Sequence, residues 1–380
     1  MKKRFRLAAA GAAVAMIVAA CGEAPDEEDD TAAEEPANGE ATDGEEPADG
    51  DGGEEPAEEF VSCMVTDEGG VDDRSFNQSA WEGMQAAEEA GVTSDSTVVE
   101  SNAAADYEPN VSSLVAQDCG IIVTVGFLLA DTTAEQAQAN PDERFAIVDF
   151  IYEEPIENVK PLVFNTHEAA FLAGYLAAGY TSTGTVATWG GQQIPTVTIF
   201  MDGFYDGVMH YNEEKDADVE VLGWDKEAQD GQFVGDFSDT ALALQISENL
   251  IDAGADILLP VAGPLGEQAA IAARDAGETS VIWVDTDGYV SAPDYQELFL
   301  TSVMKGIAVS VEESVTSAAQ DEFSNEPFIG TLENDGVGIA PYHDFEDDIS
   351  QELKDEVDTL REQIISGELE VESDAAFETG

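Results

Sequence analysis

From Phe60 onward, short apolar runs rich in β-branched residues alternate with longer stretches whose apolar positions recur at helical spacing. The alternation of strand and helix predicts parallel sheets covered on both faces by helices, and its two successive series predict two similar α/β lobes. In the first series we expect strands at 61–66, 97–100, 121–126 and 145–150, and helices at 78–90, 111–117 and 131–139. In the second we expect strands at 184–189, 219–224, 257–261 and 281–285, and helices at 196–212, 239–253 and 266–276.

The last part of the chain alternates less regularly. It contains an apolar run at 298–304, helical patterns near 308–319 and 347–365, and a glycine-containing loop around Gly336 and Gly338. A chain that builds one lobe, then the other, and then returns has this appearance. We therefore predict a first lobe of residues 60–164 plus 287–322, and a second lobe of residues 165–286 plus 323–375.

The first twenty residues have the pattern of a lipoprotein signal peptide. Four basic residues lie within the first six positions, an apolar stretch runs from 7 to 20, and small residues precede Cys21. About 14 apolar residues are too few to span a bilayer comfortably. We predict cleavage before Cys21, lipid modification of its thiol, and a mature chain anchored on the extracytoplasmic face of the cell membrane. The alternative is an ordinary secretory signal in which Cys21 is incidental.

Residues 22–59 carry 18 acidic residues and no basic or aromatic ones. Such a segment cannot bury enough apolar surface to offset the entropy lost on ordering. We predict that residues 21–59 form a disordered, extended tether.

The acidic excess continues beyond the tether. The whole chain has 82 acidic and 13 basic residues, and from Phe60 onward 64 acidic residues face 9 basic ones. This balance excludes binding to nucleic acid or to anionic head groups through surface charge. We interpret it as an adaptation to high salt, where counterions screen the repulsion. The rival interpretation, a calcium-loaded surface, has no D-x-D-x-D-G loop to support it.

The densest candidate site is the segment 66–78, which runs from the end of the first predicted strand into a helix. Ligands of open α/β sheets bind at the carboxyl ends of strands. Asp67 lies at that point, Phe76 offers a flat face for stacking, and Ser75 or Asn77 can cap the helix. The alternative is a plain capped turn with a solvated acidic loop.

Two more predicted strands end in acids, Asp149 and Asp285. A carboxylate in that position can accept hydrogen bonds from two adjacent sugar hydroxyls, although a single strand-end aspartate is also a common turn cap. Lys305 follows the apolar run 300–304 in a chain with few cations. We expect it to pair with a carboxylate or to reach a ligand, the alternative being a chance surface lysine.

The sequence gives little support for a catalytic site or a metal site. The three histidines, His167, His210 and His343, form no metal-spaced pair and adjoin no nucleophile motif, and no dinucleotide or P-loop fingerprint is present. We predict no catalytic residue, no metal and no cofactor. Cys63 and Cys119 lie in apolar runs, which favours buried thiols over a disulfide.

The same segments carry a family resemblance. The chain resembles the BMP/PnrA-like family of solute-binding lipoproteins over most of residues 61–340. The matching stretches are 67–78, 168–174, 194–204, 261–264, 284–287 and 301–305.

The resemblance implies a type I periplasmic-binding-protein fold, in which two doubly wound α/β lobes are joined by a multi-crossover hinge. It also implies delivery of a small-molecule ligand, here a nucleoside, to the permease of an ABC importer. In the family's nucleoside receptors the base stacks on the residue that matches Phe76, and strand-end acids and a lysine hold the ribose. The implied ligand-binding residues are Asp67, Phe76, Asn77, Asp149, Gly263, Asp285 and Lys305.

One departure from the family pattern concerns the second stacking aromatic. Where the family's nucleoside receptors have it, this chain has Leu258 and Leu259, so that Trp189, Phe200 or Trp224 would have to substitute. The alternatives to a nucleoside receptor are a binding protein for a sugar or other small polar solute, and a lipoprotein sensor that uses the same cleft. A nucleosidase would need a positioned general acid or a metal beyond these aspartates.

Overall fold

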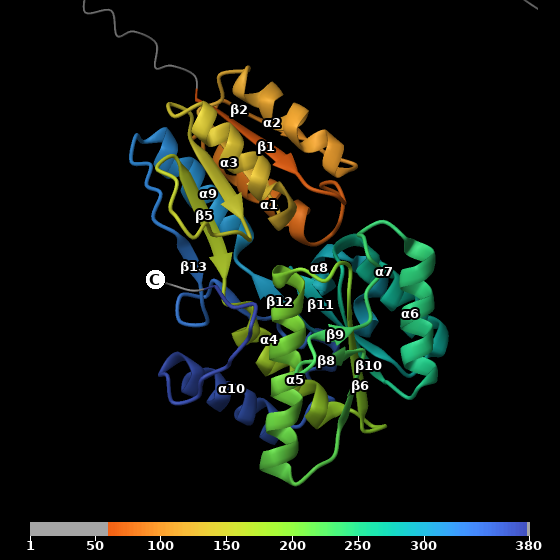
Figure 1. The fold of residues 1–380 in the computed structure, drawn as a ribbon. Helices are drawn as coiled ribbons and strands as arrows, with labels where there is room; N and C mark the ends of the chain where they lie inside the picture. Colours follow the sequence, from red (N-terminus) through yellow and green to blue (C-terminus); the bar gives the residue numbers. More distant parts are fainter. Residues whose placement is uncertain (1–59, 378–380) are drawn as a thin grey trace, which may run out of the picture. The chain divides into compact units, whose positions relative to one another are not determined.

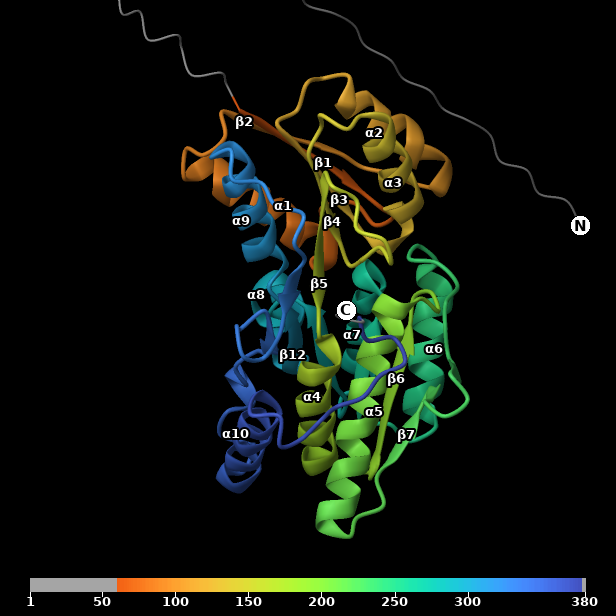
Figure 2. The ribbon, with the colours of Figure 1, turned by 60° about the vertical axis from the view of Figure 1, so that its left-hand side comes forward.

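Two six-stranded sheets organise the part of the chain that the computed structural model describes, residues 60–377. The predicted signal peptide, Cys21 and the tether lie outside these residues. The first sheet has the strand order β13-β5-β4-β3-β1-β2 and the second has the order β14-β12-β11-β10-β6-β7. Only β14 runs antiparallel to its neighbour within these two sheets. The prediction of two α/β lobes is confirmed (Figures 1 and 2).

The first lobe contains the first sheet and the helices packed on it. Its elements are β1 (Val61–Thr66), α1 (Phe76–Glu89), β2 (Asp95–Val99), α2 (Tyr107–Val115), β3 (Ile121–Val125), α3 (Ala130–Ala139), β4 (Phe145–Val148), β5 (Val159–Phe164), α9 (Ile307–Ala319) and β13 (Phe328–Gly330).

The second lobe contains the second sheet and a small hairpin, β8-β9. Its elements are α4 (Thr166–Tyr180), β6 (Thr185–Gly190), α5 (Pro195–Lys215), β7 (Glu220–Leu222), β8 (Trp224–Asp225), β9 (Asp230–Gly231), α6 (Thr240–Asp252), β10 (Ile257–Val261), α7 (Gly266–Ala276), β11 (Ser280–Asp285), α8 (Gly288–Ser291), β12 (Phe299–Lys305), β14 (Val337–Ile339) and α10 (Gln351–Ile365).

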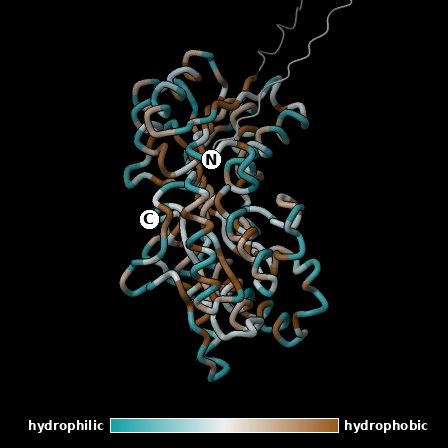
Figure 3. Tube along the Cα trace, turned by 90° about the vertical axis from the view of Figure 1, so that its right-hand side faces the viewer, coloured by the Kyte–Doolittle hydropathy of each residue, from teal (hydrophilic) through white to brown (hydrophobic). Residues whose placement is uncertain are grey.

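Both faces of each sheet are buried, as the near-continuous apolar strands predict. Along β1, Met64 packs with helices α1 and α9, whereas Cys63 and Val65 pack with α2 and α3 on the opposite face. Along β10, Leu259 and Leu258 divide in the same way between the two faces of the second sheet. Hydrophobic stretches accordingly follow the interior of both lobes in Figure 3, and hydrophilic ones follow the outer helices and loops.

The predicted lobe boundaries are wrong in the last third of the chain. β12 was expected in the first lobe but is a strand of the second sheet, between β11 and β14. β13 was expected in the second lobe but pairs with β5 at the edge of the first sheet. The chain therefore crosses between lobes after Phe164, after Lys305 and after Gly330. A three-residue edge strand such as β13 has too little pattern to reveal which sheet it joins.

The three crossings run side by side and form the hinge. Asn165 N donates to Gly330 O at 2.7 Å, and Gly306 N donates to Gly336 O at 2.8 Å. The carboxylate of Glu168 accepts from Leu332 N at 2.9 Å and so holds the third crossing against α4.

The prediction of free thiols is also wrong, because Cys63 and Cys119 form a disulfide. Both residues are buried as expected, with 1% and 4% of their surface exposed. Cys63 lies on β1 and Cys119 just before β3, and these strands are neighbours in the sheet. Burial in apolar runs does not distinguish a thiol from a disulfide. What decides the matter is strand adjacency, which the sequence pattern does not specify.

Candidate ligand-binding site

A pocket between the two lobes is lined by the carboxyl ends of strands from both sheets. All seven predicted ligand residues line it: Asp67, Phe76, Asn77, Asp149, Gly263, Asp285 and Lys305. Asp67 follows β1 and Asp149 follows β4 in the first lobe, whereas Asp285 ends β11 and Lys305 ends β12 in the second. Ligands of open α/β sheets bind at the carboxyl ends of strands, and here those strand ends bring together residues that are far apart in sequence.

Lys305 is the centre of a buried ion network. Its Nζ lies 2.6 Å from Asp149 Oδ2 and 3.6 Å from Asp285 Oδ1, and no more than 6% of any of the three residues is exposed. Burial by itself lowers the pKa of the Lys305 ammonium, but the two carboxylates outweigh it and raise the pKa above the ordinary value. The lysine is therefore charged and already paired.

Of the two aspartates beside Lys305, Asp149 leaves an acceptor oxygen free in the part of the chain that the structure describes. Asp149 Oδ1 is buried and has no hydrogen-bond partner within the described residues, whereas Asp285 Oδ2 accepts from Ser75 Oγ at 2.6 Å. Asp149 and Asp285 have φ angles of +64° and +67°. Such angles are uncommon outside glycine and concentrate at ligand sites.

Asp67 is buried against the neighbouring strand end. A Cβ at Gly126 would lie 1.9 Å from Asp67 Oδ2, so glycine is required there for the carboxylate to fit. Asn77 Nδ2 lies 3.4 Å from Asp67 Oδ1, and Asn77 Oδ1 has no partner in the described part of the chain. Burial raises the pKa of Asp67 well above its usual range. A ligand hydroxyl that donated to this carboxylate would compensate for its lost hydration.

The amino end of α1 is capped by Asp73, a residue that we did not predict to have this role. Asp73 accepts hydrogen bonds from the backbone N–H groups of Ser75, Asn77 and Gln78 at 2.9–3.0 Å. Burial nonetheless raises the pKa of Asp73 to about 6. Neither Ser75 nor Asn77 caps the helix with its side chain. The Ser75 hydroxyl is directed to the second lobe instead, and Asn77 to Asp67.

Aromatic rings line the pocket from both lobes. Phe76 and Phe127 come from the first lobe, and Phe200 and Phe237 from the second. Lys305 Nζ lies 5.2 Å from the Phe76 ring centroid and 4.9 Å from that of Phe200, within cation–π range.

Of the three predicted substitutes for the second stacking aromatic, only Phe200 lines the pocket. Trp189 and Trp224 are buried in the second lobe, 0% and 4% exposed. Phe127 was missed although it lies just beyond the carboxyl end of β3, the position at which ligands of open α/β sheets bind. Phe237 was missed because it lies in an irregular loop without any pattern.

The cavity has a volume of about 60 Å³. Typical small-molecule pockets measure about 300–1,000 Å³, so the cavity in this conformation is small for an organic ligand. A pocket between two lobes joined by a hinge is the arrangement in which periplasmic binding proteins close around their ligands.

Comparisons with known proteins show to which family of proteins this chain belongs. The sequence model of the family described as Bmp, "ABC transporter substrate-binding protein PnrA-like", matches residues 60–375. The chain belongs to this family. As a PnrA-like protein it is the substrate-binding component of an ABC transporter and not an enzyme, which removes the nucleosidase alternative. Its partners are a small-molecule ligand and a permease, and it acts outside the cytoplasm.

Relatives within the PnrA-like family cover most of the chain. The ABC transporter nucleoside-binding protein BmpA of Lactococcus lactis is 30% identical over 332 residues, which cover 83% of this chain and 90% of that protein. A CD4+ T-cell-stimulating antigen of Listeria monocytogenes is 30% identical over 332 residues, covering 83% and 88%.

A crystal structure of an ABC transporter solute-binding protein from Aeropyrum pernix superposes with a TM-score of 0.72 at 23% identity, covering 82% of this chain and 92% of that one. The fold is therefore that of type I periplasmic binding proteins, as predicted. Within residues 60–377, none of the helices is long and apolar enough to cross a membrane.

Proposed function

We propose that this protein is a lipid-anchored nucleoside receptor of an ABC importer. The observation that carries the proposal is the composition of the pocket, in which aromatic rings from both lobes surround a buried network of strand-end carboxylates and one lysine. Flat rings suit a nucleobase, and acceptor carboxylates suit the adjacent hydroxyls of a ribose. The relative from Lactococcus lactis that is named a nucleoside-binding protein supports the same assignment.

In the proposed complex the base stacks on Phe76, with Phe200 or Phe237 of the second lobe on its other side. The ribose hydroxyls donate to Asp149, Asp285 and Asp67, and Lys305 pairs with the first two carboxylates. Asn77 hydrogen-bonds the base or the ribose, and the backbone at Gly263 approaches the ligand closely. Gly263 has a φ of +51°, a conformation that suits glycine.

The charge of the pocket favours a nucleoside over a nucleotide. Three acidic side chains, Asp67, Asp149 and Asp285, are buried beside a single ammonium group that is already paired. A phosphate group would enter this site without a free cation to meet it. We therefore expect a 5′-monophosphate to bind much more weakly than its nucleoside.

A calorimetric comparison tests the assignment. We expect Phe76→Leu, which keeps apolar volume but removes the ring, to weaken nucleoside binding by about 1–3 kcal/mol. Phe328→Leu is the matched control, because Phe328 lies on the edge strand β13 and does not line the pocket. A thermal-shift screen of adenosine, guanosine, inosine, uridine and cytidine identifies the nucleoside to use.

The ribose contacts are tested with a 2′,3′-dideoxy analogue. Asp285→Asn should lower affinity for the nucleoside by about 1.5–3 kcal/mol and affect the dideoxy analogue far less, because the analogue lacks the hydroxyls. Asp287→Asn, two residues further along, is the control. Tight binding of free ribose, or indifference to Phe76→Leu, would instead favour a sugar-binding protein.

The lipid anchor is proposed from the sequence alone. Cys21→Ser should leave the precursor unlipidated and release or mislocalise the protein, as measured by membrane fractionation. Full membrane attachment of that variant would contradict the anchor.

A further inference from the structure

Helix α5 contributes to the second-lobe wall of the pocket, and one of its buried residues does not line the pocket. Its first turns direct Thr196, Val197 and Phe200 into the pocket. Asp202, two residues further on, is 0% exposed and lies among side chains of the second lobe. A fully buried carboxylate needs hydrogen-bond donors. The segments that supply these donors to Asp202 are therefore held against α5.

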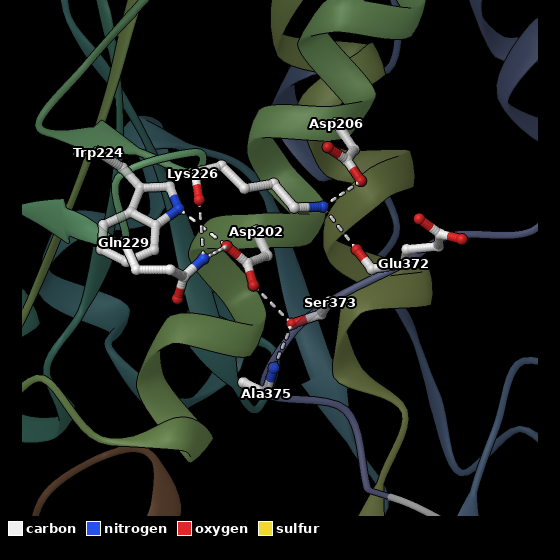
Figure 4. Close-up of polar contacts among 8 residues, drawn as sticks. All are labelled: Asp202, Asp206, Trp224, Lys226, Gln229, Glu372, Ser373 and Ala375. Carbon is white, nitrogen blue, oxygen red and sulfur yellow. Dashed lines mark hydrogen bonds and ion pairs between the residues drawn. The ribbon is translucent and has the colours of Figure 1, made fainter.

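Asp202 binds two segments that are far apart in sequence (Figure 4). Its Oδ1 accepts from Trp224 Nε1 at 3.0 Å and from Gln229 Nε2 at 3.1 Å, both on the β8-β9 hairpin. Its Oδ2 accepts from Ser373 Oγ at 2.6 Å. Ser373 lies near the end of the chain, so the helix, the hairpin and the C-terminal segment meet at one carboxylate.

The C-terminal segment is residues 369–377, which we call the strap. It has no helix or strand, yet Val371 is buried and Phe377 packs against the core. Lys226 of the hairpin donates to Glu372 O at 2.6 Å and to Asp206 Oδ2 at 2.6 Å. The strap is therefore attached to α5 and to the hairpin through side chains, without strand pairing.

The hairpin leads directly to another part of the pocket wall. After β9 the chain passes through Phe233 and Phe237, whose rings lie against Gly190 and Gly191. A Cβ at Gly191 would lie 2.4 Å from the Phe237 ring, so this packing needs a glycine. Gln229 also accepts from Gln193 Nε2 through its backbone carbonyl, and this contact ties the hairpin to the segment before α5.

We propose that Asp202 is a positioning residue for ligand binding, and that the strap completes its hydrogen-bond shell through Ser373. The strap then holds the start of α5 and the Phe237 loop in the arrangement that lines the pocket, without touching the ligand. The proposal rests on the proposed function in so far as this wall contacts the base. Without Ser373, Asp202 Oδ2 would be a buried acceptor with no donor within the described residues, and the hairpin would have to move to satisfy it.

The experiment compares single changes in the strap of the purified protein. Ser373→Ala removes the donor to Oδ2, and Ser373→Thr restores a hydroxyl at the same position. Ser366→Ala is the matched control, because the Ser366 hydroxyl donates only to Gln363 O on the exposed end of α10. Adenosine and uridine serve as a purine and a pyrimidine probe, with affinity measured by calorimetry.

Two further readouts require no ligand. The first is amide hydrogen exchange of residues 232–238, and the second is the indole N–H resonance of Trp224 in ¹⁵N spectra. We expect Ser373→Ala to weaken binding of the probe about tenfold, to speed exchange in 232–238 by a similar factor and to shift the Trp224 resonance. Ser373→Thr should reverse most of these changes, and Ser366→Ala should produce none.

Unchanged exchange and an unchanged Trp224 resonance in Ser373→Ala would overturn the proposal, as would equal effects from Ser366→Ala. If the unaltered protein binds none of adenosine, guanosine, inosine, uridine and cytidine, the nucleoside assignment fails, and the exchange and resonance measurements still decide whether the strap holds the wall. Asp202→Asn provides a second route, because it keeps the shape of the side chain but replaces one acceptor with a donor. The same pattern of loosening is expected from it.

Discussion

His167 lies buried on α4, 6% exposed, and its Nδ1 has no hydrogen-bond partner among residues 60–377. Burial, reinforced by the nearby charge of Lys226, lowers the pKa of His167 to about 4. The imidazole is therefore neutral in the folded protein at neutral pH, while the unfolded chain has an ordinary histidine with a pKa near 6.5.

This difference predicts how stability changes with pH. Between about pH 6.5 and pH 4 the unfolded state takes up a proton that the folded state does not, so the contribution of His167 to stability falls as the pH falls. Across that window we expect a loss of about 3 kcal/mol relative to His167→Gln, since each unit of pKa difference is worth about 1.36 kcal/mol. Urea unfolding at several pH values measures it. A similar flattening of the profile by His210→Gln would show that the effect does not belong to His167.

At the scale of elements, the disulfide joins β1 to the start of β3 and closes a ring that contains α1, β2 and α2. Removing it with Cys63→Ala and Cys119→Ala together should lower the free energy of unfolding by about 4 kcal/mol in the chain-entropy description. Denaturant unfolding checks the value, with the unaltered protein in reductant as the parallel sample. An unchanged midpoint in both samples would mean that the ring contributes nothing. A disulfide also agrees with an extracytoplasmic protein.

The loop before α1 connects the two lobes directly. The carbonyl of Arg74 accepts from Trp283 Nε1 and Thr286 Oγ1 at 3.1 Å, and its guanidinium lies 3.8 Å from Glu267 and 3.7 Å from Asp294. All four partners belong to the second lobe. Separation of the lobes would break these contacts, so they stabilise the arrangement in which the lobes meet.

Because the two ion pairs are long and partly exposed, we expect a small and salt-dependent effect. Arg74→Gln should weaken ligand binding by up to about 1 kcal/mol at low salt and by much less in molar salt. Arg274→Gln is the control, since Arg274 lies over Tyr295 within the second lobe. Affinities measured at 0.1 M and 2 M KCl are the test, and an equal loss at both concentrations would contradict an electrostatic origin.

At the scale of the whole molecule, the acidic surface is largely unpaired. Seven of the nine basic residues between 60 and 377 lie within 4 Å of a carboxylate, which leaves most of the 64 acidic residues in the chain from Phe60 onward without a basic partner. We propose that the protein is adapted to high salt. Its melting temperature should fall as salt is lowered, because the Debye length grows from about 3 Å at 1 M to 30 Å at 0.01 M. A melting temperature that stays flat over that range would require another cause for the charge.

The sequence pattern predicted most strands and helices of both lobes because apolar runs and helical periodicity are local properties. It missed α4, whose residues are buried on nearly every side, so that no polar face marks the helical period. It also missed β13 and β14, which are three residues each, and with them the lobe assignment of β12. Local patterns do not record which sheet a strand joins.

The residues of the candidate site divide in the same way, into those that a local pattern predicts and those that depend on contacts between distant segments. Asp67, Asp149, Asp285 and Lys305 could be predicted because each lies at a strand end, where the fold itself brings side chains together. Phe237 and Asp202 could not, because their places depend on contacts between segments that no spacing in the sequence connects. The pairing of Cys63 with Cys119 was missed for the same reason.

The three crossings of the hinge also set the order in which the molecule can be completed. A chain that emerges amino end first has β1 to β5 available early, but the edge strand β13 of the same sheet comes only after β6 to β12 of the other lobe. Neither lobe is a continuous piece of the chain. During synthesis and export the second sheet can therefore assemble, apart from β14, while the first still has an unpaired edge at β5. Such an edge can pair with another chain until β13 covers it.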